Sequence, residues 1–150
     1  MLLVVIDLGV KFIIVSTRVE FEILTNFLSI GFVENVDACL KILDGDYSVL
    51  GLFAVKMIVL LMLIFIVSRA KGYDVIKWGL LLLLAGNLGN LINLLTYDGK
   101  AIDWIVLGSF VAINLADVYL LVGISVIAYQ LITWLFTGCL TKKLLEIIKT

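Results

Sequence analysis

The sequence predicts an all-α membrane protein with four transmembrane helices and a small extracytoplasmic β-sheet between helices 1 and 2. Two observations predict this fold class. The 150 residues are 63% apolar with a mean hydropathy of +1.23, whereas soluble domains are roughly 45–50% apolar. A chain of this size leaves about a third of its unfolded surface exposed after folding, so the surplus must face lipid. The apolar residues also gather in four stretches of near-transmembrane length, and we interpret 1–150 as one integral membrane domain.

Composition also limits the chemistry. The net charge of −1 offers no basic surface for nucleic acid. The chain has no histidine, which removes imidazole bases and histidine metal sites. We expect no metal and no cofactor, and the charge leads us to expect no nucleic-acid partner. The first residues lack a basic segment of the kind that begins a cleaved signal peptide, and we expect them to stay in the membrane. Cys39 and Cys139 fall on opposite sides of the bilayer in the topology below, so no disulfide is expected.

The four predicted spans cover about residues 1–17, 49–67, 78–95 and 110–137. The first contains Asp7 and Lys11, whose spacing puts them on one helix face where their charges can neutralise each other. The second carries Lys56 as its only charge, and the third carries none. The fourth belongs to an apolar run from Trp104 to Thr141 that is interrupted only by Asp117. Because this run is too long for one span, its beginning is expected to be loop or interface.

Basic residues predict the orientation, because cytoplasmic loops carry an excess of Lys and Arg. Two groups qualify: Arg69, Lys71 and Lys77 between spans 2 and 3, and Lys142, Lys143 and Lys149 after span 4. Both termini are then cytoplasmic, and segments 18–48 and 96–108 face outward. The first outer segment is acidic and alternates apolar and polar residues over 19–23 before a mixed run over 27–33. This pattern predicts a small sheet at the outer surface, and the second outer segment is predicted as a loop.

Two acidic residues are predicted to meet near the outer membrane surface. Asp117 lies about 38 Å from Lys142 along an ideal helix, at the outer edge of a hydrocarbon core of about 30 Å. Asn90 and Asn93 on the third span approach the same level. Asp103 lies in the second outer loop, close enough in sequence to Asp117 for the loop to fold back over the fourth span.

These acids have a structural and a functional interpretation. A charge within a span costs about 2.5–3.5 kcal/mol, and Asp117 could offset that cost by capping the fourth span or by pairing with Lys56, while Asp103 could be an ordinary loop acid. Helix packing in lipid accounts for the glycines of the third span. The functional interpretation needs both acids: two close carboxylates share one proton, so one acts as a base towards water while the other donates to a carbonyl.

Three strings carry a family resemblance: Ala85–Ile92 (AGNLGNLI), Ala101–Ile105 (AIDWI) and Ile113–Asp117 (INLAD). In this order and spacing they resemble lipoprotein signal peptidase, also called signal peptidase II. That family has Gly-Asn on its third span, Val-Val-Asp-Phe in its last outer loop and Phe-Asn-x-Ala-Asp opening its fourth span. Asp7 and Lys11 fit the family's Asp-x-x-x-Lys, and Asn35 with Ala38 fits a remnant of its Asn-Thr-Gly-Ala-Ala-Phe. The resemblance covers essentially the whole chain.

The resemblance implies an aspartic endopeptidase of the bacterial cytoplasmic (inner) membrane, with its active site at the outer face. Such an enzyme removes the signal peptide from prolipoproteins by cutting just before a cysteine that carries diacylglycerol. Its partners are the prolipoprotein and membrane lipid, and we expect a monomer. By the match, Asp103 and Asp117 would be the catalytic dyad. The residues that would bind substrate or orient the dyad are Asn35, Asn90, Asn114, Asp7 and Lys11.

Two other interpretations stay open at this point. The chain could be a non-catalytic multi-pass protein, either an inactive relative or a small transporter in which Asp7, Lys11 and Asp117 form a proton or ion relay. Relays usually place acids near the bilayer midplane, whereas the residue count along the chain places Asp103 and Asp117 near the outer edge of the bilayer. A Ser-Lys protease would need a serine such as Ser48 beside Lys56, and nothing in the local sequence marks either residue.

Overall fold

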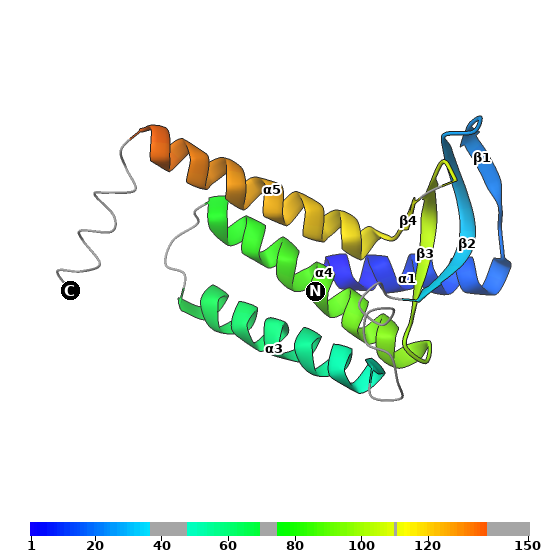
Figure 1. Cartoon of the computed structure of the whole chain (residues 1–150), viewed down its shortest axis with the longest axis horizontal. Coiled ribbons are helices and arrows are strands. Elements are labelled where there is room, and N and C mark those ends of the chain that lie inside the picture. Colours follow the sequence, from blue (N-terminus) through cyan, green and yellow to red (C-terminus); the bar gives the residue numbers. More distant parts are fainter. Residues whose placement is uncertain (37–47, 70–74, 110, 138–150) are drawn as a thin grey trace.

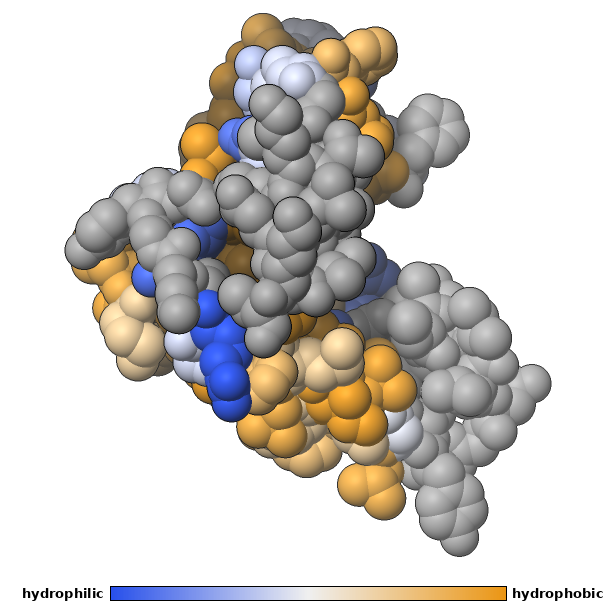
Figure 2. All heavy atoms as spheres, turned by 90° about the vertical axis from the view of Figure 1, so that its left-hand side faces the viewer, coloured by the Kyte–Doolittle hydropathy of each residue, from blue (hydrophilic) through white to orange (hydrophobic). Residues whose placement is uncertain are grey.

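The computed structural model describes residues 1–36, 48–69, 75–109 and 111–137. In chain order the elements are α1 (Leu2–Thr17), β1 (Phe21–Leu24), β2 (Leu28–Val36), α3 (Ser48–Arg69), α4 (Val75–Thr96), β3 (Lys100–Leu107), β4 (Val111–Ile113) and α5 (Leu115–Phe136). The long helices lie alongside one another, and the strands form a layer at one end of them (Figure 1). Seen from the opposite end, apolar side chains occupy much of the coloured surface (Figure 2), as a membrane location requires.

Within the described part of the chain, three helices are long and apolar enough to cross a membrane: Leu50–Arg69 within α3, α4 and α5. The predicted second and third spans are confirmed as apolar helices. The fourth helix begins at Leu115 rather than at residue 110, because Val111–Ile113 pairs as a strand. Helix α1 has 16 residues and is therefore about 24 Å long, less than the hydrocarbon thickness of about 30 Å. That α1 forms a fourth span stays a prediction.

The sheet differs from the prediction and makes the chain more than an all-α protein. It is antiparallel with the order β1-β2-β3-β4, so half of it comes from the segment between α4 and α5, which was predicted as a loop. A tight turn with Asp98 and Gly99 at φ 50° and 83° reverses the chain after α4, and β3 then pairs with β2. The prediction missed β3 because its apolar residues merge with the run that leads into the fourth helix.

Helix α4 is the centre of the bundle and packs against α1, α3 and α5. Small residues allow its backbone to approach that of α5. A Cβ added at Gly86 would lie 2.5 Å from the carbonyl oxygen of Ala116, and one added at Gly123 would lie 2.8 Å from the carbonyl oxygen of Gly79. Such close approach is typical of helix packing in lipid. It holds the first turn of α5 directly against the polar face of α4.

Candidate active site

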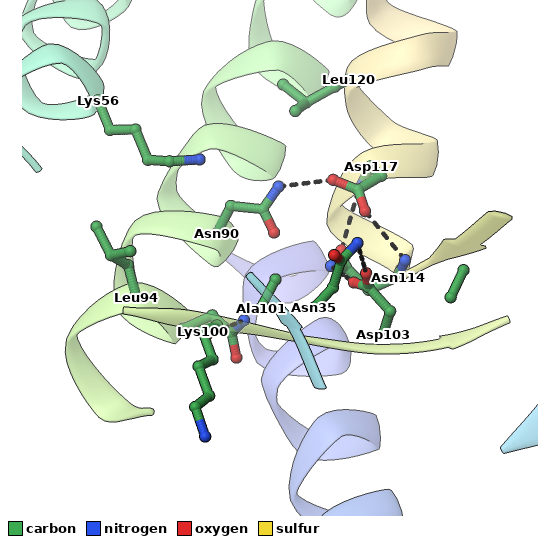
Figure 3. A pocket seen from close by; sticks show the side chains of 12 residues that line it. Asn35, Lys56, Asn90, Leu94, Lys100, Ala101, Asp103, Asn114, Asp117 and Leu120 are labelled. Carbon is green, nitrogen blue, oxygen red and sulfur yellow. Dashed lines mark hydrogen bonds between the residues drawn. The ribbon is translucent and has the colours of Figure 1, made fainter. Parts of the chain in front are cut away.

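Asp103 and Asp117 line one pocket of about 240 Å³ at the junction of the sheet and the helices (Figure 3). Asp103 lies in β3, opposite Val33 of β2, and Asp117 lies in the first turn of α5. Asn35 of β2, Asn90 of α4 and Asn114 at the start of α5 line the same pocket. The structure therefore brings together five of the seven site residues that were predicted from the sequence.

Asp103 is buried and held by two amides. Its Oδ2 accepts a hydrogen bond from Asn35 Nδ2 at 3.1 Å, and its Oδ1 accepts one from Asn114 Nδ2 at 2.7 Å. The side chain is 3% exposed. Burial raises the pKa of Asp103 above its usual value, and the nearby Asp117 charge adds to the rise, while the two amide donors and Lys11 oppose it. The net direction favours a proton on Asp103.

Asp117 is more accessible and is held by its position in the helix. Its Oδ1 accepts a hydrogen bond from Asn90 Nδ2 at 2.8 Å, and its Oδ2 accepts one from the backbone N–H of Asn114 at 3.1 Å. In return Asn114 Oδ1 accepts from the backbone N–H of Asp117 at 3.1 Å. This reciprocal pair is a capping box. A carboxylate at this place also suits the positive end of the helix dipole.

Asn114 connects the two acids. Its side-chain nitrogen binds Asp103, while its side-chain oxygen and backbone N–H bind Asp117. The residue is fully buried, so this arrangement is fixed by its surroundings. Two neighbouring carboxyl groups, one of which has a raised pKa, can divide the work of acid and base between them.

Asp7 and Lys11 lie next to the start of α5 and are not part of the pocket lining. Lys11 Nζ donates to Asp7 Oδ2 at 2.7 Å, and both side chains are buried, at 1% and 0% exposure. Asp7 Oδ1 accepts from the backbone N–H of Ala116 at 3.0 Å. The pair therefore satisfies a second free N–H in the first turn of α5, next to Asp117. Gly89 makes room for it, since a Cβ there would lie 2.7 Å from Asp7 Oδ2.

Two pocket-lining lysines were not among the predicted site residues. Lys56 reaches the pocket from α3, and Lys100 lies at the start of β3. Lys100 donates to Glu34 on the neighbouring strand at 2.8 Å, and that bond lowers the pKa of Glu34. The sequence feature that could have identified Lys56 as a site residue is that it is the only charge inside its predicted apolar span. Cys39 and Cys139, and the side chain of Ser48, lie outside the described residues.

Comparison with known families gives a match over most of the chain. A family model described as signal peptidase (SPase) II matches residues 1–133. A lipoprotein signal peptidase of Staphylococcus haemolyticus is 32% identical over 137 residues, which are 87% of this chain and 85% of the relative. One from Staphylococcus aureus is 30% identical over 137 residues, covering 86% and 82%. One from Mesorhizobium japonicum is 32% identical over 90 residues, so the chain spans about half of that relative, 53%.

Two solved structures have the same fold. Both are described as bacterial membrane enzymes whose structures were obtained by the in meso method. The first superposes with a TM-score of 0.76 at 28% identity, over 89% of this chain and 84% of the other. The second gives a TM-score of 0.75 at 30% identity, over 87% of each chain.

Proposed function

This chain belongs to the signal peptidase II family, and we propose that it is a membrane aspartic endopeptidase that cleaves prolipoproteins. The substrate would carry diacylglycerol on a cysteine, and the cut would fall just before that cysteine. The family match supports a protease with a prolipoprotein substrate. The dyad and its mechanism are our proposal from the geometry of the site.

One observation carries the assignment of Asp103 and Asp117 as the dyad. Two acids from different elements, strand β3 and helix α5, line the same pocket and share Asn114 as a hydrogen-bond partner. A merely structural acid at the start of α5 would need only the capping box, and it would not need a second, buried carboxyl group beside it. Burying that carboxyl costs stability, which a catalytic role explains.

The different environments of the two acids assign their roles. Asp103, whose pKa is raised by burial, holds the proton, and Asp117 is the base. Asp117 takes a proton from water while the water oxygen attacks the scissile carbonyl, and Asp103 donates its proton to the carbonyl oxygen. In the tetrahedral diol that results, one carboxyl group returns a proton to the leaving amine as the C–N bond breaks, and the other accepts the diol proton. The dyad ends with one proton, as it began.

Catalysis by the dyad is tested with purified protein in nanodiscs and a diacylglyceryl-modified prolipoprotein. Asp103→Asn and Asp117→Asn should each abolish cleavage, and the double variant should be scarcely worse, because residues acting as one unit are not additive. Asp98→Asn is the matched control, since Asp98 is an exposed acid in the turn before β3. A single dyad variant that cleaves at the normal rate would contradict the assignment. A wild-type protein that does not cleave would favour the non-catalytic interpretation.

A further inference from the structure

Lys56 is a charged residue in an apolar helix that the proposed mechanism does not use. Within α3 the only other charged residue is Arg69 at the end of the helix. The helix around Lys56 is apolar enough to cross a membrane, and a charge at such a position is expensive and usually functional. The Lys56 side chain extends from α3 towards Asn90 in the pocket (Figure 3).

A hydrogen bond from α4 fixes where Lys56 stands. Asn87 Nδ2 donates to the backbone oxygen of Lys56 at 3.0 Å, and Asn87 is itself 8% exposed. This bond ties α3 to α4 one helical turn from Asn90, which supports Asp117. The fold thereby holds a positive charge on the pocket wall formed by α3, across from the acids on β3 and α5.

The same part of the pocket offers an acceptor. Asn90 uses its Nδ2 to bind Asp117, and among the described residues its Oδ1 is buried without a hydrogen-bond partner. A buried acceptor of this kind is costly unless something binds it. Lys56 and Asn90 thus present a donor and an acceptor to one space. A peptide group in an extended chain has the complementary pair, a C=O and an N–H.

We propose that Lys56 is a substrate-binding residue of this enzyme. Its ammonium group donates to a main-chain carbonyl of the substrate close to the bond that is cut, and Asn90 Oδ1 accepts a main-chain N–H of the same segment. The assignment rests on the proposed function, and it makes Lys56 a determinant of how the peptide is seated. Lys100, the other lysine of the pocket, lies on β3 and forms an ion pair with Glu34 on the neighbouring strand.

The test is steady-state cleavage of the modified prolipoprotein by Lys56→Met and Lys56→Arg proteins in nanodiscs. Loss of a hydrogen bond to a charged group should raise KM by about 10-fold or more in Lys56→Met, while kcat changes by less than about 3-fold. Lys56→Arg keeps a charged donor and should stay within about 3-fold of the wild-type KM. Arg69→Met is the matched control, because it removes the other positive charge of α3 at the end of the helix, outside the pocket lining, and it should leave KM near the wild-type value. If Lys56→Met does not fold, Lys56→Gln is measured by the same criteria.

Other outcomes separate this assignment from the proposed function. An unchanged KM in Lys56→Met, with wild-type protein that cleaves, would overturn the Lys56 assignment alone. A fall in kcat together with a shifted pH profile would mean that Lys56 acts on the dyad instead of on the substrate, which also overturns it. Absence of cleavage by the wild-type protein would overturn the proposed function and this assignment with it.

Discussion

At the scale of single residues, the site uses asparagines to distinguish two chemically identical acids. Asn35 and Asn114 donate to Asp103, and Asn90 donates to Asp117. An amide can donate to a carboxylate without adding a charge to the site. Burial raises the pKa of Asp103 and the amide donors lower it, so in the proposed mechanism these residues would set the pH range in which the two acids hold one proton.

Replacing Asn35 with Ala should move the alkaline limb of the kcat/KM profile to higher pH. That limb reports loss of the Asp103 proton in the proposed mechanism. The hydrogen bond from Asn35 lowers the pKa of Asp103, so its removal raises this pKa and delays proton loss as pH increases. A charged hydrogen bond of about 1.5 kcal/mol corresponds to a shift of about one pH unit.

Ser29→Ala, on the same strand, is the control for this measurement and should leave the limb in place. A shift of the limb to lower pH in Asn35→Ala would contradict the assignment of the proton to Asp103.

At the scale of elements, the start of α5 is the part of the fold on which the site depends. Three neighbours hold it: the capping box of Asn114, the Asp7 carboxylate of α1 on the Ala116 N–H, and the close approach of Gly86 on α4. The free N–H groups of a first helical turn are satisfied here by side chains from two elements. Contacts from α1 and α4, as well as the cap of its own helix, therefore hold Asp117 in position.

Removing Lys11 alone should destabilise the protein strongly. Lys11→Met leaves the buried Asp7 carboxylate without its ammonium partner, which costs about 3–5 kcal/mol in comparable buried pairs. The double variant Asp7→Asn with Lys11→Met keeps an acceptor for the Ala116 N–H and removes the charge, so much of the loss should be recovered. Thermal unfolding in nanodiscs measures both. If the double variant is as unstable as the two single losses added together, the residues do not act as a pair.

Gly89→Ala should destabilise the contact of α4 with α1, whereas Gly9→Ala should not. A Cβ at Gly89 would lie 2.7 Å from Asp7 Oδ2 and 3.2 Å from Ala116 Cβ, while a Cβ at Gly9 meets nothing within 4 Å. Overpacking of this kind costs about 1–3 kcal/mol, and Gly→Ala in an open helix position gains about 0.5–1 kcal/mol. Unfolding temperatures give the comparison. Equal effects of the two substitutions would show that Gly89 is not needed for the Asp7 contact.

At the scale of the whole molecule, the pocket is lined by residues of both the sheet and the helices, and the sheet lies at one end of the helices (Figure 1). The inner ends of the predicted topology, at the end of α3 and the start of α4, carry Arg69 and Lys77. A substrate anchored in lipid by its acyl chains would meet the pocket at the membrane surface in this orientation. The positive-inside rule is the basis for the orientation.

The orientation predicts which exposed positions a membrane-impermeant thiol reagent reaches in intact cells. Glu22→Cys in β1 should be labelled and Val75→Cys at the start of α4 should be spared; both residues are exposed in the structure. The background carries Cys39→Ser and Cys139→Ser, so that only the introduced thiol reacts. Labelling of Val75→Cys before the cells are opened would reverse the proposed orientation.

The sequence by itself determined the membrane class, the approximate positions of α3 and α4, the end of α5 but not its beginning, and the family. These features depend on composition and on short sequence motifs, which can be recognised without knowing which elements pack against each other. The Asp7 and Lys11 spacing also predicted their pairing, because both lie on one face of a single helix.

Only the tertiary structure decided how the site is assembled. Strand β3 could not be predicted because strand pairing depends on a partner far away in sequence, and its apolar residues merge with those that precede α5. Three other features of the site are likewise contacts between elements. Asn114 binds both acids, Asp7 of α1 accepts from the Ala116 N–H of α5, and Lys56 of α3 lines the pocket. The sequence shows which polar residues are out of place in an apolar chain, and packing decides which of them meet.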